Sequence, residues 1–501
     1  MPLILTLSAR ISFAALLACV LSHPAYARSD PQTAQCGGAI EKNTWALWDS
    51  FGRDFINNAI LDARLIKQGD TDALYDTQTY LQNLAEMAVR CGRTSRLEQI
   101  AGIIGTAYRQ LEQISRPGGG VGWVCRGGRI CTSRNRLIGT EVKLYSVQFL
   151  ALAAQVANAL AHDPNRTSDD SRFVRQTLDV AISHLDRWTR GSDPLKISER
   201  LAATPASVRN GESKLFFTDN DLWMLTLEAE IAGILDVVSP APDSFTSSVR
   251  DQTGAAFRGL TRLLVARLSI RTIQSARFGT VTVADLDRGF WRQYADSRFA
   301  AYTDPAGPVT CSPDGKRIQK PGFKPADVPL VDDIGWDFSH ARRFVHAFAS
   351  LDSNRLALMH VWQIQDEDLP PANLSSEFAA TLVTTLWNGD VTWPLFSNYW
   401  NGSNGWYRVA YDNGSTGCFA GYGPSGLSDA FTTGDFIVWQ QYQPIIGTLG
   451  LRLLDLSTST GSDEQAFIRK YYSGLSTSAS EANRKATQLM FWPSLVAGAT
   501  E

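Results

Sequence analysis

Acidic residues stand at the expected starts of several apolar helices, mostly beside an aromatic residue. Residues 218–223 read TDNDLW, and residues 336–340 read WDFSH. Carboxyl groups are suited to cleaving glycosidic bonds: a protonated acid donates to the leaving oxygen, while a carboxylate activates water or attacks the sugar. If these helices are parallel, their N-termini meet at one mouth and the acids line one cavity. The acids concerned are Asp76, Glu141, Asp219, Asp221, Asp337 and Asp435.

Within this set, Glu141, Asp221 and Asp337 are expected to carry the carboxylate chemistry, with Asp219 as the substitute for Asp221. Asp76 and Asp435 are expected to contact substrate. A simpler explanation applies to each acid alone. Asp, Thr and Ser favour helix N-caps and first turns, where they accept backbone N–H bonds and complement the helix dipole.

Aromatic residues are concentrated in the second half of the chain. Seven of the 14 tryptophans fall between Trp336 and Trp439, and residues 396–408 (FSNYWNGSNGWYR) mix rings with amides and glycines. Flat rings stack on the apolar faces of sugars, while Asn and Arg bond sugar hydroxyls. The residues expected to bind sugar are Trp223, Trp336, His340, Tyr399, Trp400 and Trp406.

Helices are the elements that must position these residues. Residues 144–160 are apolar on nearly every side, which is typical of a buried helix. The apolar pattern continues at 222–235, 344–351 and 436–456, with a kink expected at Pro444, and amphipathic helices are expected at 96–114 and 171–189. Strand-like alternation is confined to short stretches at 278–283 and 406–411. The prediction is an all-α fold in which buried inner helices alternate with amphipathic outer ones, joined by long loops.

In this organisation the chain resembles the (α/α) toroid enzymes that act on polysaccharides, which are barrels of helical hairpins with long loops. Residues 218–223 look like the acid-acid-x-x-aromatic helix start of several glycosidases of that class, although Asn220 separates the two aspartates. The resemblance covers most of the chain. It implies a glycoside hydrolase acting on a poly- or oligosaccharide as the leading function.

The same class contains polysaccharide lyases, in which a His or Tyr removes the proton next to a uronate carboxylate and an Asn or Arg neutralises that carboxylate. His340 and Tyr399, together with Asn398 and Arg342, offer such a set. A lyase is therefore the alternative function. A non-catalytic glycan-binding protein is a third.

The N-terminus reads as a cleavable signal peptide. Arg10 precedes an apolar run at 11–21, and the small-residue site Ala25-Tyr26-Ala27 follows. The run is too short to span a bilayer. We expect residues 1–27 to be removed and residues 28–501 to form one catalytic domain in the periplasm or outside the cell. A lipid anchor on Cys19 is not expected, because Leu17 fits a lipoprotein box poorly.

The six remaining cysteines suggest disulfides in an exported chain. Chain proximity favours Cys125 with Cys131, within a loop at 115–136 that is rich in Gly and Arg. Cys311 and Cys418 both lie in turn-rich segments, and pairing them leaves Cys36 with Cys91. Other pairings are possible on spacing alone.

The charge balance argues against polyanionic partners. The 47 basic and 50 acidic residues give a net charge of −3, which offers no electrostatic footprint for nucleic acid or an anionic membrane. No segment after the signal peptide has the uninterrupted apolar length of a membrane span. Histidines are few, and no metal-ligand spacing occurs, so neither a metal nor another cofactor is expected.

Overall fold

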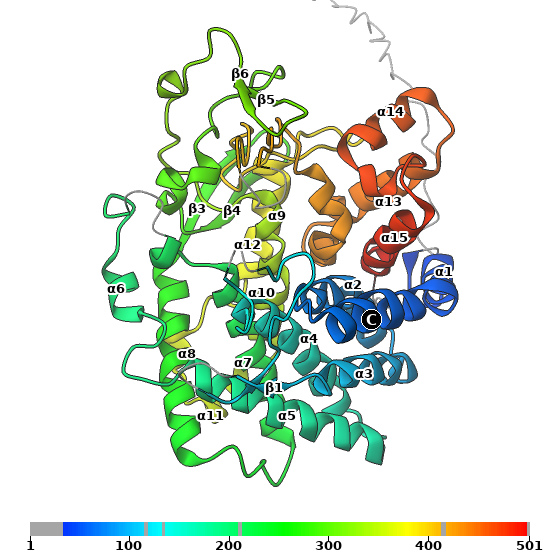
Figure 1. Ribbon diagram of the computed structural model, residues 1–501, viewed down its shortest axis with the longest axis vertical. Coiled ribbons are helices and arrows are strands. Elements are labelled where there is room, and N and C mark those ends of the chain that lie inside the picture. The colour runs from blue at the N-terminus through cyan, green and yellow to red at the C-terminus, as the bar shows by residue number, and fades with distance from the viewer. Residues whose placement is uncertain (1–33, 115–118, 133–135, 209–212, 412–416, 498–501) are drawn as a thin grey trace, which may run out of the picture.

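A computed structural model describes residues 34–114, 119–132, 136–208, 213–411 and 417–497 of the chain. The predicted signal peptide and Cys19 lie outside these residues. Helices dominate the described chain, which confirms the all-α prediction (Figure 1). The α-helices are α1 (Ala39–Leu47), α2 (Asp72–Arg90), α3 (Thr94–Tyr108), α4 (Lys143–Ala161), α5 (Ser168–Trp188), α6 (Ile197–Ala202), α7 (Asp219–Val237), α8 (Ser247–Arg267), α9 (Phe338–Ala341), α10 (Arg343–Ser353), α11 (Arg355–Val361), α12 (Leu374–Thr381), α13 (Pro444–Thr458), α14 (Ser462–Tyr471) and α15 (Glu481–Leu495).

Shorter elements connect these helices. The π-helical segments are η2 (Trp48–Gly52), η3 (Phe55–Gln68) and η9 (Leu382–Leu386). The 3₁₀ segments are η4 (Ser213–Leu215), η5 (Phe290–Gln293), η6 (Ala295–Ser297), η7 (Pro325–Asp327), η8 (Asp366–Asp368), η10 (Ser428–Thr433), η11 (Asp435–Gln441) and η12 (Ser473–Leu475). The strands form antiparallel pairs: β1 (Glu112–Gln113) with β2 (Val121–Gly122), β3 (Leu268–Ser275) with β4 (Gly279–Leu286), and β5 (Val309–Cys311) with β6 (Arg317–Gln319). In the longest pair, Leu268 lies opposite Leu286.

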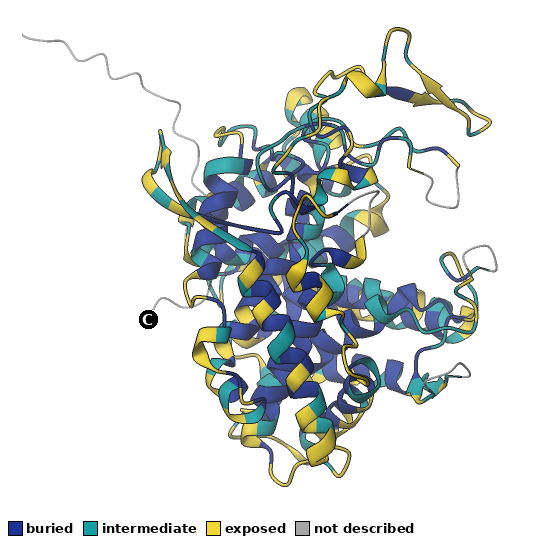
Figure 2. Cartoon of the chain, turned by 90° about the vertical axis from the view of Figure 1, so that its left-hand side faces the viewer, coloured by how far each residue is buried: buried dark blue, intermediate teal, exposed yellow. Residues whose placement is uncertain are grey.

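The core is built around α4 and α7, which pack against each other along their lengths. α4 is apolar on nearly every side because α2, α3, α5 and α7 surround it. Its length and composition would also suit a membrane span, and 72% of the relevant window is buried inside the structure. Figure 2 shows the central helices as almost wholly buried, whereas the β5–β6 hairpin projects and is mostly exposed.

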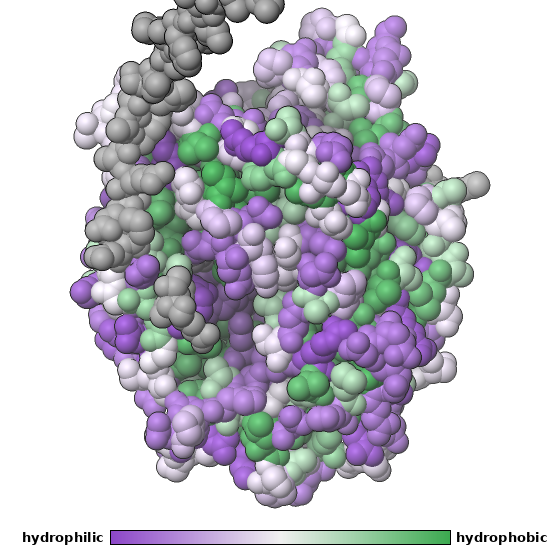
Figure 3. All heavy atoms as spheres, turned by 180° about the vertical axis from the view of Figure 1, so that it is seen from behind, coloured by the Kyte–Doolittle hydropathy of each residue, from purple (hydrophilic) through white to green (hydrophobic). Residues whose placement is uncertain are grey.

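Contacts between helices bring distant parts of the chain together. α2 contacts α4, α7 contacts α10, and α15 near the C-terminus packs against both α1 and α2. The backbone N–H of Ala497 donates to the carbonyl of Ala34 at 2.7 Å, so the two ends of the described chain meet. On the face opposite to that of Figure 1, hydrophilic and hydrophobic residues intermix, and hydrophilic ones line a central hollow (Figure 3).

All three predicted disulfides are present. Cys36 is bonded to Cys91, Cys125 to Cys131, and Cys311 to Cys418. Because disulfides persist in oxidising compartments, they suggest a periplasmic or extracellular environment for the folded chain. This agrees with the prediction of export.

Local structure departs from the predictions at three places. Pro444 begins α13 instead of kinking a longer helix, because its fixed φ and missing N–H suit the first helical turn. The helix expected at 96–114 ends at Tyr108. The stretch expected as a strand at 406–411 forms only an isolated bridge between Tyr407 and Tyr422 among the described residues.

Candidate functional site

A cavity of about 370 Å³ lies where the first turns of α2, the junction of α9 with α10, and segments from the last hundred residues meet. This volume falls within the range of small-ligand pockets in proteins. The titratable residues that line the cavity are Tyr75, His340, Arg342, Arg343, Arg408 and Asp429.

Asp337 and His340 form a hydrogen-bonded pair at the start of α9. Asp337 caps the helix: its Oδ1 accepts bonds from the His340 backbone N–H at 3.1 Å and from the Ser339 hydroxyl at 2.5 Å. Its Oδ2 accepts the Tyr407 hydroxyl at 3.1 Å and lies 2.7 Å from His340 Nδ1. Although burial opposes ionisation, His340 and the hydrogen-bond donors hold the pKa of Asp337 well below its usual range. An ionised Asp337 favours a proton on Nδ1, which leaves Nε2 as the nitrogen able to accept one.

Tyr75 lies on α2 beneath two guanidinium groups. Its hydroxyl accepts bonds from Arg343 Nη2 at 2.9 Å and from Arg342 Nη2 at 3.4 Å. Burial alone would raise the pKa of Tyr75, but Arg343 and Arg342 outweigh burial and lower it. Both arginines are themselves held by carboxylates: Asp435 lies 2.8 Å from Arg342, and Asp219 lies 3.8 Å from Arg343. Because the phenolate is stabilised, Tyr75 donates its proton more readily than a free tyrosine does.

Arg408 adds a third guanidinium to the cavity wall. Its Nε donates to Asp296 at 3.2 Å, and its backbone φ of 54° lies in the left-handed region. Residues other than glycine adopt that conformation seldom, and often at functional sites. Asp429 lines the same cavity from η10, where burial raises the pKa of its carboxyl to about 6. With three arginines lining it, the cavity suits an anionic ligand.

The six acids predicted from helix starts each have a basic partner. The pairs are Asp76 with Arg64, Glu141 with Arg187, Asp219 with Arg343, Asp221 with Arg200, Asp337 with His340, and Asp435 with Arg342. Asp219, Asp337 and Asp435 lie behind the cavity, each bound to a residue that lines it. The other three form pairs with residues that do not line it. The structure therefore does not gather the acids as one row of free carboxylates.

Glu141 is engaged in a buried ion pair before α4 begins. It accepts bonds from Arg187 and from the Trp188 indole N–H, the latter at 3.1 Å, and lies 3.4 Å from His184 Nε2. Although burial opposes ionisation, His184 and Arg187 lower the pKa of Glu141 to about 2. A carboxyl group with that pKa is ionised at neutral pH and unsuited to donate a proton.

Asp221 stabilises the start of a helix, as the simpler explanation of the acidic helix starts predicted. Its Oδ2 accepts the backbone N–H of Thr218 at 2.7 Å in a capping box at the start of α7. Both its oxygens also bind Arg200, at 3.1 and 2.5 Å. These contacts account for a helix start that resembled a catalytic motif.

We expect Glu141→Gln to lower the free energy of unfolding by about 3 kcal/mol at pH 7, because the change leaves Arg187 without its carboxylate in a mostly buried site. The folded-state pKa lies below the unfolded value, so the stabilisation is present above about 4.5 and disappears as the pH falls through about 2. Urea unfolding across this range measures the effect. Glu481→Gln, which removes an exposed partner of Lys485, is the control and should change stability little. Lost turnover with unchanged stability would instead restore Glu141 as a catalytic acid.

Most rings predicted to bind sugar belong to the core. Trp223, Trp336 and Trp400 are at most 2% exposed, and Tyr399 is fully buried with its hydroxyl donating to two backbone carbonyls at 3.1 Å. A sugar cannot stack on a ring that protein encloses, so these residues support the site without contacting substrate. Trp406 is partly exposed and lies two residues before the arginine in the cavity wall.

Only part of the residue set predicted for a lyase reaches the cavity. His340 and Arg342 line it. Asn398 is buried, and its amide nitrogen donates to the carbonyls of Gly405 at 2.7 Å and Gly423 at 2.8 Å. Tyr399 is buried as described above, and Tyr75 supplies the phenol that faces the ligand space.

Tyr75, Arg343 and Arg408 are the site residues that sequence reasoning missed. One signal was available: Arg342 and Arg343 occupy the N-terminal boundary of α10, where the helix dipole disfavours cations. Adjacent arginines at such a position indicate that something other than helix stability keeps them there. No comparable local pattern marks Tyr75 or Arg408.

One group of potential metal ligands occurs within the described part of the chain, formed by Cys36, Cys91 and Glu41. The two sulfurs are joined in a disulfide, and Glu41 binds Arg93 at 2.7 and 3.1 Å. This chemistry does not suit a metal ion, because cysteine binds metals as a free thiolate and these two sulfurs are bonded to each other.

Comparisons of the chain with protein-family models, with curated proteins and with solved structures found no match. The function must therefore be argued from the chemistry of the cavity.

Proposed function

We propose that the protein is a polysaccharide lyase that cleaves uronate-containing glycans by β-elimination. The observation that carries the proposal is one cavity lined by a carboxylate-oriented histidine, a tyrosine of lowered pKa and three arginines. Paired-carboxylate hydrolysis is supported less well, because Arg187 and Arg200 bind Glu141 and Asp221, and His340 binds Asp337.

His340 is the proposed base. Asp337 holds the proton of the imidazole on Nδ1, so Nε2 takes the proton from C5 of the uronate, next to its carboxylate. Asp337 itself contacts no substrate and acts as a positioning residue. Arg343 and Arg408 face the uronate carboxylate and stabilise the negative charge that develops on it.

Tyr75 is the proposed acid. The electrons of the broken C5–H bond form a double bond between C4 and C5, and the C4–O4 bond breaks. The leaving O4 oxygen takes the proton of the Tyr75 hydroxyl. Arg342 and Arg343 then stabilise the phenolate, to which both already donate. Proton return from His340 to Tyr75 completes the cycle.

We further propose that the helices form the (α/α) toroid common among such enzymes. Support comes from the contacts of α2 with α4, of α4 with α7, of α7 with α10, and of α15 with α2. In this arrangement the first turns of α2 and the α9–α10 junction lie at the mouth of the ring, where the cavity is.

The proposal is tested by incubating the mature chain with uronate polymers (alginate, polygalacturonate and hyaluronan) and with a neutral glucan. We expect at least one uronate polymer to yield products with an unsaturated, ultraviolet-absorbing end, and the neutral glucan to remain intact. Saturated new ends would support the hydrolase instead, with Asp429 as the candidate acid because its pKa is about 6. Binding without any cleavage would support a glycan-binding protein.

A further inference from the structure

The loop at 115–136 is strongly basic. It contains five arginines and no acidic residue. The disulfide between Cys125 and Cys131 closes its described tip, and both cysteines are buried. The loop thus combines positive charge with a disulfide that restrains its described tip.

The loop is fitted closely to the turn that precedes α2. The backbone N–H of Arg126 donates to the Gly69 carbonyl at 2.9 Å. A Cβ at Gly127 would meet the Gln68 carbonyl, and one at Gly128 would overlap the Asp70 side chain. Glycine at these positions permits the close approach. The described tip of the loop, with Arg126 and Arg129, is therefore a fixed platform.

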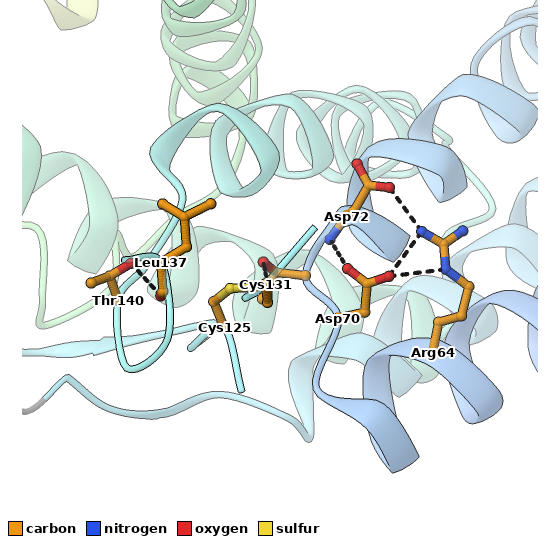
Figure 4. Close-up of a disulfide and its surroundings, with 8 residues drawn as sticks. Arg64, Asp70, Asp72, Cys125, Cys131, Leu137 and Thr140 are labelled. Atoms are coloured by element: carbon orange, nitrogen blue, oxygen red, sulfur yellow. Dashed lines mark hydrogen bonds and ion pairs between the residues drawn. A yellow bond between two sulfur atoms is a disulfide. The ribbon is translucent and has the colours of Figure 1, made fainter. Parts of the chain in front are cut away.

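Arg126 and Arg129 are exposed on this platform, and two nearby acids, Asp70 and Asp72, lie beneath them. A third acid, Glu112, is 40% exposed and lies 3.2 Å from Arg126. Arg129 is 74% exposed and Arg126 is 45% exposed. Asp72 and Asp70 are almost fully buried and bind Arg64, with Asp72 accepting its Nη2 at 2.9 Å (Figure 4). Arg129 donates to Asp72 at 3.0 Å and keeps most of its guanidinium in solvent. A ligand approaching Arg129 meets its exposed guanidinium before the buried carboxylate of Asp72.

The platform adjoins the candidate site through α2. Asp72, which binds Arg129, is one helical turn from Tyr75 in the cavity wall. Tyr145 interacts with both: burial and the Asp72 carboxylate raise the pKa of its hydroxyl, and its ring packs edge-on against Tyr75 with centroids 6.0 Å apart. Arg129 therefore contacts the same first turn of α2 that carries Tyr75.

We propose that Arg126 and Arg129 form a second anion-binding subsite, which holds the carboxylates of uronate residues beyond the one being cleaved. This inference rests on the proposed function, because that function identifies the ligand as a uronate polymer. Two exposed guanidiniums contribute mainly long-range attraction, so their effect should depend on salt and on ligand length.

The test compares the double variant Arg126→Gln/Arg129→Gln with the intact chain in native gels containing alginate or polygalacturonate. We expect the polymer dissociation constant to rise about tenfold at low salt, and the slope of its logarithm against log salt to fall by about one per arginine removed. KM for the cleaved polymer should rise in parallel, whereas kcat and the KM of the shortest cleaved oligosaccharide should not change.

Arg172→Gln is the matched control, since Arg172 is also 74% exposed and binds one aspartate, on α5. It should leave polymer binding unchanged. Polymer binding that survives the double change, or that weakens equally in the control, overturns the subsite. Arginine-dependent binding without unsaturated products would sustain the subsite and reject the lyase. Unsaturated products with unaltered polymer binding would sustain the lyase and reject the subsite.

Discussion

Replacing His340 by Gln is expected to lower kcat for uronate cleavage by about 10³-fold, because a positioned general base contributes roughly 10²- to 10⁴-fold. KM should stay within about twofold, since His340 removes the proton without holding the carboxylate. The unfolding midpoint should change little, because the ring lines a cavity and is partly exposed. Initial rates from ultraviolet absorbance, with urea unfolding in parallel, measure these quantities.

His360→Gln is the matched control for this change. His360 also contacts an aspartate through Nδ1, at 3.3 Å from Asp236, but it is 67% exposed and distant from the cavity lining. Its loss should affect neither rate nor stability. If His340→Gln kept more than about a tenth of the activity, His340 would not be the base, and Tyr75 would become the candidate for that role.

The sequence predicted the fold class from local signals, since the apolar residues at 144–160 exclude any exposed helix face. Among the disulfides, only the pairing of Cys125 with Cys131 followed from proximity in the chain. Cys311 and Cys418 were paired because both lie in turn-rich segments, which left Cys36 with Cys91. His340 was also accessible to sequence reasoning, since its spacing of three from Asp337 places both residues on one helix face.

The residues of the candidate site could not be predicted in the same way, because the acids meet their partners only in the folded chain. Arg187 lies 46 residues after Glu141, and Arg200 lies 21 residues before Asp221. A helix-start carboxylate that an arginine neutralises has the same local sequence as one that faces substrate. The tryptophans were misleading for a related reason. Clusters of aromatic residues occur in the sugar-binding clefts of other proteins, but in this chain most of them fill the core beneath the site.

A buried chain of charges holds Arg342 in place behind the cavity. Asp435 lies 2.8 Å from Arg342 Nη1 and 3.1 Å from His346 Nε2, and His346 Nδ1 lies 2.8 Å from Glu86. These four groups alternate in sign along the chain. Although burial opposes its protonation, Glu86 and Asp435 raise the pKa of His346 to about 9.

Asp435→Asn should therefore have the largest effect on stability, lowering the free energy of unfolding by about 4 kcal/mol at pH 7. The change keeps the shape of the side chain but leaves two buried cations without their shared carboxylate, a loss typically of about 3 to 5 kcal/mol. Chemical unfolding followed by tryptophan fluorescence measures it. Asp236→Asn removes the surface partner of His360 and should change stability by less than about 0.5 kcal/mol.

The dependence of this loss on pH separates an electrostatic cause from simple mispacking. The pKa of His346 is raised in the folded chain, so its stabilisation is fully present below about 6.5 and disappears as the pH rises through about 9. Without Asp435, the folded-state pKa of His346 falls, so this alkaline decline should be smaller and should end at lower pH in the variant. The same charges hold the pKa of Asp435 below its usual range, so its contribution is lost in acid and the two proteins should converge there. A stability difference that stayed constant from acid to alkaline pH would show that Asp435 acts through packing alone. It would also show that the negative charge of Asp435 is not required to hold Arg342 in place.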